Sequence, residues 1–185
     1  MTTGVLLSSV SRRDFVARVA AALPVLALAP HSFAEATAGP RVLDFSHLHT
    51  GERLEVEYFS GGTYVPDALR AIDQLLRDFR TGDVHRIEPG LLDLLHQLAS
   101  ATDSRRPFEV ISGYRSAASN AQMKAQGRGV ASSSLHTEGK AIDVRVPGRR
   151  LDSVRDAALA LARGGVGYYP QDGFVHVDVG RVRRW

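Results

Sequence analysis

The chain of 185 residues contains no cysteine, and this absence excludes several kinds of chemistry at once. Disulfide bonds, cysteine-ligated zinc sites and thiol nucleophiles are all ruled out. Any metal ion that the protein binds must therefore be held by histidine and carboxylate side chains. The lack of cysteine does not identify the compartment, because an exported protein with a large enough core folds without disulfides.

The chain also has little excess of positive over negative charge. The formal net charge is only +3, and no basic run interleaved with aromatic residues occurs, so we expect no nucleic acid partner. The hydrophobic fraction of 44% argues against a disordered chain. Length and composition together predict one globular domain with its own core.

A long apolar run is absent as well. Residues 19–30 form an apolar segment of about 12 residues, whereas a helix that spans a bilayer needs about 20. The segment follows a twin-arginine pair at 12–13, and residues 36–38 are small, as at a signal cleavage site. We interpret residues 1–38 as a cleaved twin-arginine signal peptide, which leaves residues 39–185 without a transmembrane span. The alternative is an amphipathic N-terminal anchor.

Hydrophobic periodicity predicts a mixture of helices and strands. The predicted helices are residues 66–80, 89–100, a segment from 112 to about 126, and 151–163. The predicted strands are residues 53–59, 108–111, 140–146, 164–169 and 174–179. Because a short turn joins the last two strands, the pattern predicts an α+β domain with a largely antiparallel central sheet flanked by helices.

The candidate site is the segment 134–143 together with His176. His136 lies seven positions before Asp143, which is on a predicted strand, and Gly139 between them lets the chain fold back. Two histidines and one carboxylate form a common catalytic zinc set, in which the fourth coordination position is left to water. A histidine in a strand is more often a hydrogen-bonded structural residue, so the spacing by itself leaves both interpretations open.

The segment resembles the signature of the zinc D-alanyl-D-alanine peptidases and their relatives in the lysostaphin, D-Ala-D-Ala and hedgehog superfamily, through Ser134, His136, Gly139, Ala141 and Asp143. Further similar elements are residues 49–52, 91–95, 112–115, 164–169 and 174–178. This wider resemblance is to the exported murein endopeptidase K family and extends over most of residues 39–185.

The resemblance implies a hedgehog/D-Ala-D-Ala-peptidase-like fold and a Zn²⁺ ion held by His136, Asp143 and His176. It also implies a periplasmic endopeptidase that cuts cross-links between peptidoglycan stem peptides, and we expect a monomer. Arg115 would meet the substrate's carboxylate or polarised carbonyl, a geometry that suits a guanidinium fork. Ser134 is a second candidate for substrate binding. The alternatives are a surface ion pair for Arg115 and a local cap for Ser134.

These motifs do not by themselves identify the residue that accepts a proton from the attacking water. Many relatives have an acid three residues before the last ligand, where this chain has Gly173. Asp178 lies two residues after His176, on the same face of a strand, and is expected to act as the catalytic base or to orient a ligand. Asp172, in the predicted turn, is the second candidate for the base.

Three functions follow from this sequence. The first is a zinc-dependent murein endopeptidase, and the second is a carboxypeptidase that removes a D-amino acid from the same substrate. The third is a zinc-stabilised wall-binding module without catalysis, which the missing acid at Gly173 favours.

Overall fold

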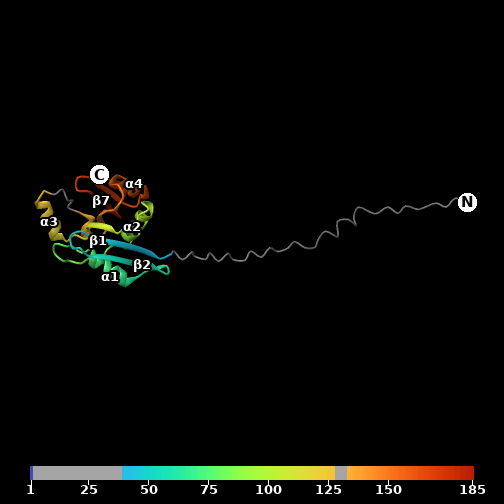
Figure 1. The fold of residues 1–185 in the computed structure, drawn as a ribbon, viewed down its shortest axis with the longest axis horizontal. Helices are drawn as coiled ribbons and strands as arrows, with labels where there is room; N and C mark the ends of the chain where they lie inside the picture. Colours follow the sequence, from blue (N-terminus) through green and yellow to red (C-terminus); the bar gives the residue numbers. More distant parts are fainter. Residues whose placement is uncertain (2–38, 128–132) are drawn as a thin grey trace. The chain divides into compact units, whose positions relative to one another are not determined.

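The computed structural model describes Met1 and residues 39–127 and 133–185. The predicted signal peptide, apart from Met1, lies outside the described residues. From residue 39 onward, the described part of the chain forms one sheet with four α-helices packed around it (Figure 1). The predicted α+β class is therefore confirmed. None of the helices in the described ranges has the length and apolar character needed to cross a bilayer.

The eight strands of the described residues are β1 (Arg41–His47), β2 (Arg53–Ser60), β3 (Thr63–Tyr64), β4 (Phe108–Ser112), β5 (Ala141–Arg145), β6 (Gly165–Tyr169), β7 (Phe174–Asp178) and β8 (Arg183–Arg184). The helices are α1 (Pro66–Leu75), α2 (Pro89–Ala101), α3 (Ala117–Ala125), α4 (Leu151–Leu161) and the short 3₁₀ helix η1 (Leu135–Glu138). The strand order is β3-β2-β1-β4-β5-β7-β6-β8. Only the pairs β1–β4 and β6–β8 are parallel, which confirms the largely antiparallel sheet.

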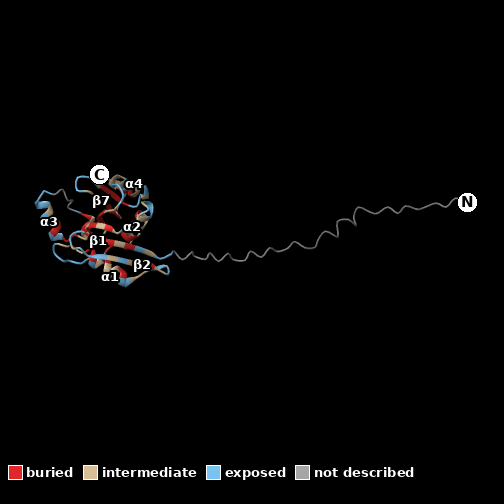
Figure 2. Cartoon of the chain, in the orientation of Figure 1, coloured by how far each residue is buried: buried red, intermediate tan, exposed pale blue. Residues whose placement is uncertain are grey.

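The two faces of the central strands carry different kinds of side chains. Ile142 and Val144 of β5 alternate with Ala141 and Asp143, and the two branched side chains are fully buried in the hydrophobic core. Helices α2 and α4 pack against each other and against β1, β6 and β7 on the core side. Figure 2 shows the buried residues concentrated where helices and sheet meet. The core thus fixes the strands whose other face carries Asp143.

Helix α1 ends five residues before its predicted end at residue 80, because the backbone there has other partners. The carbonyl of Leu76 accepts a hydrogen bond from the amide of Tyr114 at 2.8 Å. The buried carboxylate of Asp78 accepts from the amides of Arg80 at 3.0 Å and Ser116 at 2.9 Å. These bonds, one within the loop and two to the segment between β4 and α3, replace the last helical turn, so the prediction for this end was wrong.

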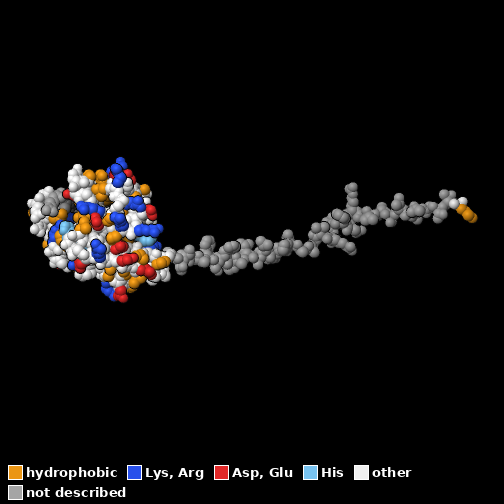
Figure 3. Space-filling view, in the orientation of Figure 1, with side chains coloured by type: hydrophobic (Ala, Val, Ile, Leu, Met, Phe, Trp, Pro, Cys, Tyr) orange, Lys and Arg blue, Asp and Glu red, His pale blue; other side chains and the backbone are white. Residues whose placement is uncertain are grey.

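The surface of the domain carries both signs of charge. Figure 3 shows Lys and Arg side chains interspersed with Asp and Glu on the face in view. Several form ion pairs, and one of them anchors the core: Asp93 of α2 accepts bonds from Arg41 at 2.6 Å, from Tyr58 at 3.0 Å and from Tyr64 at 2.8 Å. One carboxylate therefore ties α2 to β1, β2 and β3.

We predict that Asp93→Ala lowers the free energy of unfolding by about 2 kcal/mol, because the fully buried Tyr58 hydroxyl loses its acceptor. Urea denaturation followed by circular dichroism measures this change. The matched control is Asp83→Ala, since Asp83 is exposed and, within the described part of the chain, its side chain bonds only the nearby Thr81. An Asp93→Ala protein with the parent's unfolding midpoint would contradict the stabilising role of Asp93.

Candidate metal centre

Two of the three predicted ligands are brought together by strand pairing. Asp143 of β5 lies directly opposite His176 of β7, and Gly167 of β6 lies opposite His176 on the other side. Ser112 of β4 is the partner of Asp143 in the next strand. Since side chains opposite each other point to the same face of a sheet, the carboxylate and the imidazole meet although 33 positions separate them.

The third predicted ligand, His136, comes from η1. Its Nδ1 lies 2.7 Å from the carbonyl oxygen of Gly113, which fixes the ring over the sheet. The 3₁₀ helix ends at Gly139, whose φ is 66°. A Cβ at that position would lie 2.2 Å from the carbonyl oxygen of Arg86, so only glycine allows the chain to turn back there. The predicted role of Gly139 is confirmed.

The three donor atoms have the spacing that one metal ion requires. His136 Nε2 lies 3.1 Å from His176 Nδ1 and 3.3 Å from Asp143 Oδ1, and His176 Nδ1 lies 2.9 Å from the same oxygen. Tetrahedral ligands at 2.0–2.1 Å from Zn²⁺ would be about 3.3 Å apart. All three residues are buried. The residues present therefore fit a zinc ion, which would take His136 Nε2, His176 Nδ1 and a carboxylate oxygen of Asp143.

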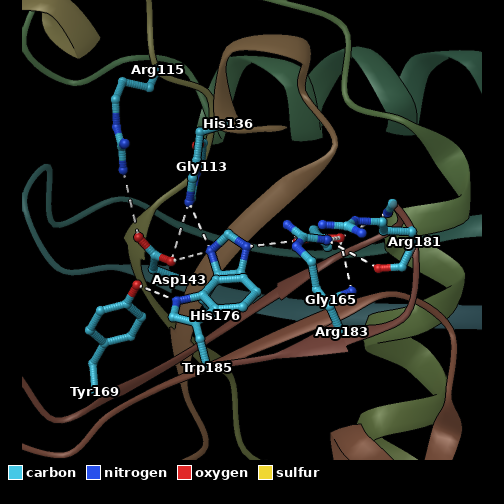
Figure 4. Close-up of polar contacts among 12 residues, drawn as sticks. Gly113, Arg115, His136, Asp143, Gly165, Tyr169, His176, Arg181, Arg183 and Trp185 are labelled. Carbon is cyan, nitrogen blue, oxygen red and sulfur yellow. Dashed lines mark hydrogen bonds and ion pairs between the residues drawn. The ribbon is translucent and has the colours of Figure 1, made fainter. Parts of the chain in front are cut away.

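The hydrogen bonds behind the histidines determine which nitrogen faces the cluster. His136 uses Nδ1 toward the Gly113 carbonyl, and His176 uses Nε2 toward Asp178 Oδ2 at 3.1 Å (Figure 4). A neutral imidazole that donates from one nitrogen presents a lone pair at the other. Two lone pairs and a carboxylate oxygen thus converge on one point, an arrangement that a cation stabilises.

Asp178 lies behind the His176 ring and has many partners. Its carboxylate accepts from His176, from both terminal nitrogens of Arg183 at 3.1 and 2.7 Å, and from the amides of Gly165 at 2.9 Å and Gly180 at 2.8 Å. The side chain is fully buried. These contacts match the carboxylate that orients a ligating histidine, the second of the two roles expected for Asp178.

Electrostatics agree with this arrangement of charges. Burial by itself raises the pKa of Asp143, but the adjacent side chains of His136 and His176 outweigh burial and hold the pKa below its usual value. Burial likewise raises the pKa of Asp178, yet His176, Arg183 and two amides bring the pKa below its normal range. Both carboxylates are therefore ionised at neutral pH.

The structure places Arg115 beside the cluster. Its guanidinium lies 3.8 Å from Asp143 Oδ2 and 3.5 Å from Asn120 Oδ1, and burial lowers its pKa. The buried Nε of Arg115 has no hydrogen-bond partner among the described residues. Ser134 is also buried and lies two residues before His136. Both predicted substrate-binding residues therefore lie at the cluster, and the Arg115 contacts are not those of a surface ion pair.

A cleft of about 920 Å³ opens over the cluster. Asp172 lines it from the exposed turn between β6 and β7, where Arg145 binds the carbonyl oxygens of Asp172 and Gly173. The residues that line the cleft are His49, Arg80, Ile111, Ser112, Arg115, Met123, Ser133, Ser134, Leu135, His136, Asp143, Tyr169, Asp172, Phe174, His176, Arg183 and Trp185. Of the two candidate bases, Asp172 is the one that lines this cleft.

Three residues that the sequence did not assign to the metal site also lie there. Tyr169, Arg183 and Trp185 line the cleft, and the Trp185 ring lies 5.1 Å from the His176 ring. Tyr169 could have been found from the period of two, because it is two residues beyond Gly167 and faces the same side of β6. Arg183 and Trp185 carry no periodic signal, since β8 has only two residues.

Comparisons with known proteins agree on one family. A family model described as peptidoglycan L,D-endopeptidase MepK matches residues 35–185. The peptidoglycan L,D-endopeptidase MepK of Escherichia coli (strain K12) is 41% identical over 176 residues, which cover 95% of this chain and 97% of the relative. A protein named probable peptidoglycan L,D-endopeptidase MepK from Haemophilus influenzae is 45% identical over 150 residues, covering 80% of this chain and 81% of that one.

One solved structure shows a partial likeness. It is the L-Ala D-Glu endopeptidase ChiX of Serratia marcescens, with 26% identity, a TM-score of 0.34, and coverage of 42% of this chain and 62% of that one. A score this low does not establish a shared fold.

We predict that Asp178→Asn weakens zinc affinity about 10- to 100-fold, because the carboxylate that orients His176 loses its charge. Competition with a chromophoric chelator measures the dissociation constant. The matched control is Asp172→Asn. Because Asp172 is exposed, this substitution should leave the zinc affinity unchanged. Equal zinc affinity in the Asp178→Asn and parent proteins would contradict the orienting role.

Proposed function

The chain belongs to the peptidoglycan L,D-endopeptidase MepK family, and from this membership and its site we propose that it is a zinc-dependent endopeptidase that cleaves peptide cross-links of peptidoglycan. The predicted resemblance to this family is thereby confirmed. The observation that carries the proposal is the tetrahedral spacing of His136, Asp143 and His176 at the floor of a cleft. A bound zinc ion would supply a Lewis acid for amide hydrolysis.

Six residues of the site have a defined role in this proposal. His136, Asp143 and His176 hold the metal, and Asp178 keeps the His176 ring in the ligating orientation. Arg115 binds the substrate's carboxylate through a guanidinium that burial keeps free of bulk water. For the proton acceptor we propose Asp172, because the carboxylate of Asp178 is enclosed behind the imidazole of His176.

The extent of the cleft favours an endopeptidase over a carboxypeptidase. His49 follows β1, and Trp185 follows β8, so the two lie toward opposite sides of β5 and β7 in the strand order. Neighbouring strands are about 4.8 Å apart, and because the Trp185 indole lies over Gly167 of β6, the four steps from β1 to β6 correspond to roughly 19 Å. A cleft that extends on both sides of the cluster has room for peptide on both sides of the scissile bond.

The cellular setting is part of the same proposal. Residues 1–38 would direct export by the twin-arginine route, and residues 39–185 would act as a monomeric domain of hedgehog/D-Ala-D-Ala-peptidase-like fold in the periplasm. The support is the twin-arginine pattern followed by an apolar segment of about 12 residues. The substrate is then the peptidoglycan stem peptides.

We predict that His136→Ala abolishes cleavage of purified murein and that removal of metal by a chelator has the same effect, with recovery on adding Zn²⁺. Mass spectrometry of digested sacculi is the measurement. Separated dimers identify the endopeptidase, whereas loss of single terminal residues identifies the carboxypeptidase alternative.

Circular dichroism is the control for folding of His136→Ala. Undiminished cleavage by the metal-free protein would contradict a metal-dependent reaction. Tight binding of murein by the zinc-loaded protein without any released fragment would indicate the wall-binding module instead.

A further inference from the structure

Tyr169 is held in the cleft by two aromatic neighbours. Its ring is stacked on Phe174, its strand partner, with centroids 4.6 Å apart and an interplanar angle of 20°. Its hydroxyl oxygen accepts a hydrogen bond of 2.7 Å from Nε1 of Trp185. Both contacts restrict the phenol, so its position in the cleft is set before a substrate binds.

Trp185 is itself fixed at the end of the sheet. Its amide donates to the carbonyl of Val166 at 3.2 Å, and its carbonyl accepts from the amide of Tyr168 at 3.1 Å. The indole lies over Gly167, where a Cβ would be only 2.7 Å from the ring. The same indole lies beside His176, with ring centroids 5.1 Å apart. Trp185 therefore places Tyr169 at a defined position relative to a metal-ligating ring.

The hydrogen-bond inventory of this pair leaves one donor free. An indole N–H can only donate, so the phenol oxygen of Tyr169 is the acceptor and its own O–H points elsewhere. Among residues 39–127 and 133–185 this hydroxyl has no acceptor. Accepting one bond strengthens a hydroxyl as a donor. Figure 4 shows the phenol directed toward Trp185 and the Asp143–His176 pair.

We propose that Tyr169 is a catalytic residue that donates a hydrogen bond to the carbonyl oxygen of the scissile peptide bond. This inference rests on the proposed endopeptidase function. The carbonyl oxygen gains negative charge as water attacks, and a donor fixed in advance stabilises that charge. The phenol keeps its proton throughout. Arg115 is engaged with Asp143 and Asn120 and is assigned to the substrate's carboxylate, so it is not the donor to the scissile carbonyl.

Tyr169→Phe is the direct test, because it removes only the hydroxyl and keeps the ring stacked on Phe174. With a purified cross-linked muropeptide we expect kcat to fall about 100-fold, while KM changes less than about threefold. Zinc affinity should stay at the parent value, whereas a structural disturbance of His176 would lower it. The matched control is Tyr168→Phe: that ring lies under the guanidinium of Arg155 and outside the cleft, so both constants should be unchanged.

Trp185→Phe provides the second variant. It keeps an aromatic ring near His176 but removes the N–H, and we expect a smaller loss of kcat than in Tyr169→Phe. Parent-like kcat in Tyr169→Phe, or a loss confined to KM or to zinc content, overturns the role of Tyr169 and leaves the endopeptidase function intact. Failure of the zinc-loaded parent to cleave any cross-linked muropeptide overturns the proposed function and this inference together.

Discussion

The pairing register of β5 against β7 is the constraint on which the site depends. It sets Asp143 opposite His176 on one face, while Ile142 and Val144 enter the core on the other. A slip of one residue would exchange these faces and send the carboxylate into the hydrophobic core. The buried valines and isoleucine therefore do more than stabilise the fold, because they hold the two ligand donors in contact.

Buried charge is the second consequence of this arrangement. Asp143, His176 and Asp178 lie together in the domain interior, where an unpaired charge costs several kcal/mol. The structure compensates with paired groups: Arg183 and two backbone amides saturate Asp178, and Arg115 approaches Asp143. The same contacts fix the imidazole orientation. The interactions that stabilise the buried charges therefore also orient the metal ligands. This explains why Arg183 of β8 belongs to the site.

Most strands, and the three residues that come together in the metal site, could be predicted from the sequence. The orientation of the individual side chains within the site could not. Alternation located β5 and β7, and the family resemblance carried by His136, Gly139 and Asp143 implied a ligand pair. The period of two also put Asp178 on the face of His176, yet only the ring orientation shows that the imidazole separates Asp178 from the cluster. Strand β8 and Trp185 have no local pattern, since their position comes from pairing with β6. The early end of α1 likewise depends on tertiary bonds of Leu76 and Asp78.

We infer that the outer hydrogen bonds of His136 and His176 select one nitrogen of each ring for the metal. The most direct measurement is a crystal structure of the zinc-loaded protein with anomalous diffraction at the zinc edge. We predict zinc about 2.0–2.2 Å from His136 Nε2, His176 Nδ1 and an oxygen of Asp143, with His176 Nε2 still bonded to Asp178. Coordination through His176 Nε2, or a zinc ion bound away from these three residues, would contradict it.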